Sequence, residues 1–130
     1  HCGQINFKER TGLECVALAV EKVLRTARQK YAEYGIQETP YAYIKADSGT
    51  YGMGIMTVQS GDEVMEINKK ARNKMNVVKE GAQVSEVVVQ EGVPTIDRIG
   101  DAVAEPVIYL VDGTAVGGAY RVNDARDAYN

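Results

Sequence analysis

A lysine followed by a glycine-rich segment is the feature best suited to bind phosphate groups. Lys45 lies near the end of a short aromatic and β-branched run, and a G-x-x-G-x-G pattern places Gly49, Gly52 and Gly54 just after it. Glycines lack a Cβ, so their backbone N–H groups can approach phosphate oxygens closely. Two predicted strands flank the segment, whereas phosphate loops of the P-loop and dinucleotide types lead into a helix. A flap over a nucleotide is one interpretation; a plain turn, with Lys45 facing solvent, is the other.

Two further places could contribute to such a site. Gln90-Glu91-Gly92-Val93 ends an apolar run, and a strand end of this kind can offer an adenine ring an apolar slot with polar groups at its edge. An ordinary strand-to-loop transition would look the same. Arg121 stands in a strand of small and apolar residues, where it could hold a phosphate through two hydrogen bonds or form a surface ion pair.

Composition excludes several classes of protein. The 130 residues fit one compact domain better than two, and 45% of them are hydrophobic, which argues against disorder. The net charge is −3 and no run of about 18 apolar residues occurs, so neither a membrane span nor a nucleic-acid surface is expected. The basic cluster within 69–74 is expected to be a solvated helix face.

The two cysteines indicate the expected redox environment, and the first residue indicates whether the chain is a fragment. Cys2 and Cys15 form no metal-type pair, and free thiols in a reducing cytoplasm are expected for them. The chain begins with His1 rather than Met, which suggests a fragment of a longer protein with no visible signal peptide.

The first half of the chain predicts a helix, two strands and a second helix. Apolar residues spaced by three and four predict a long amphipathic helix over 12–34, opened by a T-x-x-E capping box at 11–14 and ended by Gly35. Strands are expected at 41–46 and 55–58. A second capping box at 60–63 predicts a helix reaching about Lys70 or Lys74.

The second half predicts strands. Residues 84–90 form a nearly continuous apolar run, which suggests a strand buried on both faces. Asp112-Gly113 between two strand-like runs, 106–111 and 114–122, predicts a β-hairpin. The expected fold is therefore α+β, with a mainly antiparallel sheet flanked by helices.

Taken together, these motifs resemble one family over nearly the whole chain. The segment from Tyr43 to Met56, which contains KADSGTYGMG, is similar to the lysine-plus-flap segment of the GshA-type glutamate–cysteine ligases, which are ATP-grasp enzymes. The blocks at 72–81, 87–93, 101–107 and 116–122 are similar to later blocks of the same family.

The resemblance implies a function and a set of roles. Residues 1–130 would be part of an ATP-grasp nucleotide-binding region in a cytoplasmic enzyme that joins glutamate to cysteine with ATP and Mg²⁺. Lys45 would bind ATP phosphates and Gly49, Gly52 and Gly54 would form the flap. The adenine site would be lined by Gln90, Glu91 and Val93, and Arg121 would steady the transferring phosphoryl group.

The resemblance also has limits. Family members are longer, and the residues expected to hold Mg²⁺ would lie beyond Asn130, so the chain is expected not to complete catalysis alone. The alternatives are a non-catalytic ATP-binding module and a plain interaction module. The sequence says nothing of oligomeric state.

Overall fold

A computed structural model describes residues 2–47, 54–76 and 84–123. The chain divides into two compact units, His1–Gly92 and Val93–Asn130, and each is described here by itself. The flap residues Gly49 and Gly52 lie outside the described residues, whereas Gly54 lies within them.

Helix α1 (Leu13–Tyr34) is the longest element of the first unit. Its buried stripe follows the three-and-four spacing that the sequence predicts, and its members are Leu13, Val16, Val20, Leu24, Ala27 and Tyr31. Gly35 ends the helix in the left-handed conformation, as expected. The capping box predicted at its start is wrong. The N-cap is Gly12, which has no side chain that could accept a hydrogen bond. Thr11 lies one residue before the N-cap, where its backbone exchanges hydrogen bonds with that of Asn6.

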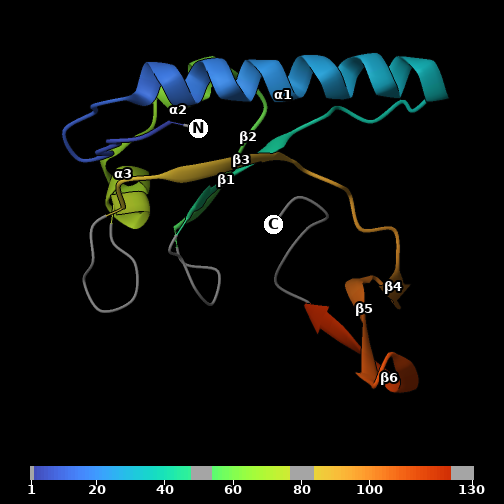
Figure 1. The fold of residues 1–130 in the computed structure, drawn as a ribbon. Coiled ribbons are helices and arrows are strands. Elements are labelled where there is room, and N and C mark those ends of the chain that lie inside the picture. The colour runs from blue at the N-terminus through green and yellow to red at the C-terminus, as the bar shows by residue number, and fades with distance from the viewer. Residues whose placement is uncertain (1, 48–53, 77–83, 124–130) are drawn as a thin grey trace. The chain divides into compact units, whose positions relative to one another are not determined.

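Three antiparallel strands pack beneath α1 (Figure 1): β1 (Ala42–Ala46), β2 (Ile55–Val58) and β3 (Val87–Glu91), in the order β2-β1-β3. Ala42, Ile44 and Ala46 alternate along β1 and are buried in the core cluster with the apolar stripe of α1. Only one face of β3 is buried, so the prediction of burial on both faces is wrong. Val88 is 47% exposed because it projects away from α1.

Two short helices follow β2 where the sequence predicted one. The N-cap of helix α2 (Gly61–Met65) is Ser60, whose hydroxyl accepts a hydrogen bond from the Glu63 N–H. This bond is one of the two that define a capping box, so the second predicted box is confirmed for its serine side chain. Helix α3 (Lys69–Asn76) begins anew because the Asn68 side chain accepts from the Ala71 N–H. As expected, the basic residues of α3 lie mostly at the solvent face.

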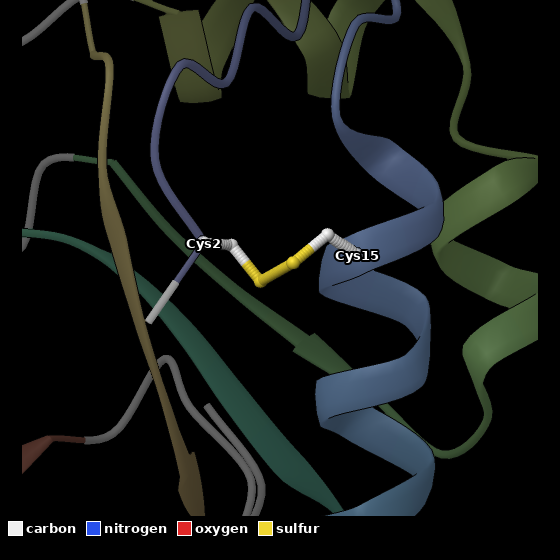
Figure 2. Close-up of a disulfide and its surroundings, with 2 residues drawn as sticks. All are labelled: Cys2 and Cys15. Carbon is white, nitrogen blue, oxygen red and sulfur yellow. A yellow bond between two sulfur atoms is a disulfide. The ribbon is translucent and has the colours of Figure 1, made fainter.

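The cysteines are joined, which corrects the expectation of free thiols. A Cys2–Cys15 disulfide ties the N-terminal segment to the first turn of α1 (Figure 2). The same segment lies along the free edge of β3: Cys2 bridges Val87, and the Ile5 N–H donates to the Ser85 carbonyl. Spacing could not reveal the pairing because it depends on this edge lying beside α1.

The second unit is a three-stranded antiparallel sheet formed by β4 (Arg98–Ile99), β5 (Ala102–Val111) and β6 (Thr114–Asn123). The predicted hairpin is confirmed, with Asp112 and Gly113 both at positive φ in its two-residue turn. Its first strand begins earlier than predicted, at Ala102. Helices and antiparallel sheets together make the fold α+β, as expected.

Candidate functional site

Lys45 lies on the face of the first sheet that points away from α1. Its neighbours in β1 that face α1 are buried, whereas Lys45 and Tyr43 are half-buried on the opposite face. In the strand register Lys45 lies opposite Ile55 of β2 and Val88 of β3. The ammonium therefore emerges among apolar side chains, where an anion would feel its charge more strongly than in bulk water.

Gln90 shares this face with Lys45. It pairs with Tyr43 across β1 and β3, one diagonal step from Lys45, which corresponds to about 7–8 Å between Cα atoms. The structure thus brings together two of the residues singled out from the sequence, one from each of two adjacent strands.

Gly54 closes the base of the glycine-rich connection. Its φ of 63° is in the left-handed region, and its carbonyl accepts a hydrogen bond of 2.8 Å from the Ala46 N–H. The connection therefore starts and ends on hydrogen-bonded neighbouring strands, immediately after Lys45. This is the strand–loop–strand arrangement that the sequence predicted.

Glu91 is placed differently from Gln90. It pairs with Ala42, so its side chain belongs to the α1 side of the sheet. There it borders a groove of about 520 Å³ between α1 and β3, which Gln90 also borders, together with Lys22, Thr26 and Cys2. Glu91 and Lys45 thus lie on opposite faces. Val93 is 73% exposed and belongs to the second unit.

Arg121 pairs with Glu105 in the second unit. The two residues are register partners in β6 and β5, and the Arg121 guanidinium donates to the Glu105 carboxylate. The side chains are 73% and 49% exposed, respectively, so the pair contributes about 0–1 kcal/mol at most. This is the surface ion pair weighed as the alternative for Arg121, and a bound phosphate would have to compete with Glu105.

The described residues hold no cluster of three or more His, Cys, Asp or Glu side chains that could bind a metal ion. A Mg²⁺ site is therefore not assigned to this part of the chain. No helix in the described ranges is both long and apolar enough to cross a lipid bilayer.

Sequence reasoning missed two features of the first unit. Tyr43 lies beside Lys45, with the lysine Nζ 5.2 Å from its ring centroid, and the two-residue spacing in a strand was the signal that could have found it. A second groove of about 370 Å³ lies between β2 and helices α2 and α3, with Glu63, Glu66 and Asn68 among its lining residues. No sequence pattern indicates a groove that depends on how short helices pack.

The first unit therefore defines an α+β protein in which a lysine-bearing strand is joined by a glycine-rich connection to its antiparallel neighbour. A solved structure described as "Putative gamma-glutamylcysteine synthetase", from Methylobacillus flagellatus KT, has this fold with a TM-score of 0.85 and 56% sequence identity. The match covers 97% of this chain and 30% of that one. The family model of GshA, described as glutamate-cysteine ligase, matches residues 1–130.

The chain belongs to the GshA family of glutamate-cysteine ligases. It spans less than a third of the length of the solved relative. A search of curated proteins finds no match.

Proposed function

We propose that the chain is part of an ATP-dependent ligase that forms γ-glutamylcysteine, the first step of glutathione synthesis, in the cytoplasm. The family match over all 130 residues is the observation that carries this proposal. The 56% identity to the solved synthetase-like structure supports it, since the likeness extends over nearly the whole chain.

The proposed reaction has two balanced steps. The γ-carboxylate of glutamate attacks the terminal phosphorus of ATP, which yields an acyl phosphate and ADP. The amino group of cysteine then attacks the acyl carbon, and phosphate leaves as the amide bond forms and the amine loses a proton. Phosphoryl transfer of this kind depends on positioning and on electrostatic stabilisation, more than on covalent chemistry by the protein.

In this proposal the nucleotide is bound by residues on the face of the first sheet that points away from α1. Lys45 binds phosphate oxygens from a half-buried position, and Gly49, Gly52 and Gly54 provide the flap. Gln90 is one strand away on the same face, where its amide can pair with the edge of the adenine. Glu91, whose side chain points to the other face, contributes through its backbone.

Val93 and Arg121 lie in the second unit, and their proposed roles rest on the family resemblance alone. Val93 supplies an exposed apolar surface for the adenine ring, and Arg121 releases Glu105 to contact the transferring phosphoryl group. Mg²⁺ would neutralise phosphate charge during the transfer. In this proposal its ligands lie beyond Asn130, where the family resemblance places them.

The test replaces Lys45 by alanine in the intact longer protein and measures Mg-ATP binding by titration calorimetry. Loss of the ammonium should weaken binding tenfold or more, or roughly 1.4 kcal/mol. Lys30→Ala is the matched control, because Lys30 lies on α1 and is paired with Glu33 at 2.7 Å. Unchanged affinity in a Lys45→Ala protein with an intact circular dichroism spectrum would refute the assignment. A protein that binds ATP but makes no γ-glutamylcysteine would instead be a non-catalytic binding module.

A further inference from the structure

We propose that Tyr43 is a positioning residue for Lys45, an inference that rests on the proposed nucleotide site. The lysine Nζ lies 5.2 Å from the centroid of the Tyr43 ring, within the range of a cation–π interaction. The two residues are two positions apart in β1, so both project from the same face. The ring thus holds the ammonium on the side of the sheet that Gln90 shares.

The Tyr43 ring is itself held by the core. It makes an edge-to-face contact with Tyr41, with ring centroids 5.5 Å apart and planes inclined by 75°. Tyr41 is fully buried, and its carbonyl accepts a 2.8 Å hydrogen bond from the Gly92 N–H. The position of Lys45 is therefore connected, through two rings, to the end of β3, where Gln90 and Glu91 lie.

An aromatic ring is better suited than a carboxylate to position the Lys45 ammonium for phosphate binding. A lysine side chain has many rotamers, and ordering it on binding costs conformational entropy that a pre-positioned side chain has already lost. A carboxylate would order the lysine too, but would also neutralise it and compete with phosphate. Within the described residues no Asp or Glu forms an ion pair with Lys45, in contrast to Lys30 with its partner Glu33.

The experiment compares Tyr43→Leu with Tyr43→Phe in the intact longer protein. Mg-ATP binding is measured by calorimetry, and KM for ATP and kcat are measured separately by following γ-glutamylcysteine formation. Tyr43→Leu removes the ring but keeps an apolar side chain, so the Kd and KM for ATP should rise about threefold to tenfold. The lysine is still present, so kcat should change little. Tyr43→Phe keeps the ring, so its Kd for Mg-ATP should stay within about twofold of the wild-type value.

Two further variants separate positioning from general effects on the fold. Tyr34→Leu removes a comparable contact, that of Lys30 with the Tyr34 ring at 5.7 Å, from α1 on the other side of the sheet, and should leave ATP binding unchanged. In a Lys45→Ala background, Tyr43→Leu should have no additional effect on Kd, because the group it positions is gone.

The outcomes distinguish this inference from the proposed function. If Lys45→Ala weakens ATP binding and Tyr43→Leu does not, the positioning role is refuted while the proposed function stands. Equal weakening by Tyr43→Leu and Tyr43→Phe also refutes the role, since the ring would then be irrelevant. If Lys45→Ala has no effect, the nucleotide role of the lysine fails and the role of Tyr43 fails with it.

Discussion

Among the glycines of the first unit that the structure describes, Gly92 is the one at which an added methyl group should disturb the fold most. It is buried at the end of β3, directly against the side chain of Tyr41. A Cβ built on Gly92 would lie 2.0 Å from Cε2, 2.3 Å from Cδ2 and 2.4 Å from Cζ of the Tyr41 ring. These separations are far inside van der Waals contact, so Gly92→Ala requires the ring or the backbone to move.

The expected destabilisation is large because the Tyr41 ring has little room to move. Tyr41 is fully buried, and the hydrogen bond from the Gly92 N–H to the Tyr41 carbonyl keeps the two backbones together. Overpacking of a well-filled core costs about 1–3 kcal/mol, and this site belongs at the upper end, near 3 kcal/mol. For a unit of about 90 residues, that loss lowers the melting temperature by roughly 12 °C or more.

Thermal unfolding followed by circular dichroism measures the effect, with Gly117→Ala as the matched control. Gly117 lies in β6, and a Cβ added there meets no atom within 4 Å. Its replacement should change the unfolding free energy by less than about 0.5 kcal/mol. The comparison separates the steric effect at Gly92 from the general effect of exchanging glycine for alanine.

A second test asks whether the Tyr41 ring is the cause. Tyr41→Val removes all three clashing ring atoms, so in that background Gly92→Ala should cost less than about 1 kcal/mol, and the two substitutions should be strongly non-additive. If Gly92→Ala alone leaves the melting temperature unchanged, or if its cost is the same with and without the Tyr41 ring, the packing argument is wrong.

Two further predictions concern the helix starts. Cys15→Ser removes a disulfide between residues with a sequence separation of 13 and should lower the unfolding free energy by up to about 3 kcal/mol under non-reducing conditions. In the presence of reductant, the variant and the wild type should have the same unfolding free energy. A wild-type melting temperature that does not change when reductant is added would contradict the prediction. Ser60→Ala removes the cap of α2 and should cost about 1 kcal/mol, measured by denaturant unfolding. Thr11→Ala is its control and should be nearly neutral, because Thr11 caps no helix; equal costs for the two would count against the capping assignment.

Periodicity and turn chemistry were enough to predict most of the elements. The apolar stripe of α1, its end at Gly35 and the Asp112-Gly113 hairpin depend on residues close together in the sequence. Such local patterns determine which face of a helix or strand can be buried and where the chain must turn. The family resemblance is of the same kind, since it rests on contiguous blocks that the family comparison then confirmed.

The disulfide, the relative placement of the site residues and the role of Gly92 were decided by tertiary structure. Cys2 reaches Cys15 because the N-terminal segment lies along the edge of β3 beside α1. Gln90 and Glu91 are neighbours in sequence, yet the alternation of a strand sends only one of them to the face of Lys45. Gly92 is required because Tyr41, 51 positions earlier, packs where its side chain would be. Each of these depends on distant segments meeting in space, and no local pattern of residue types encodes that meeting.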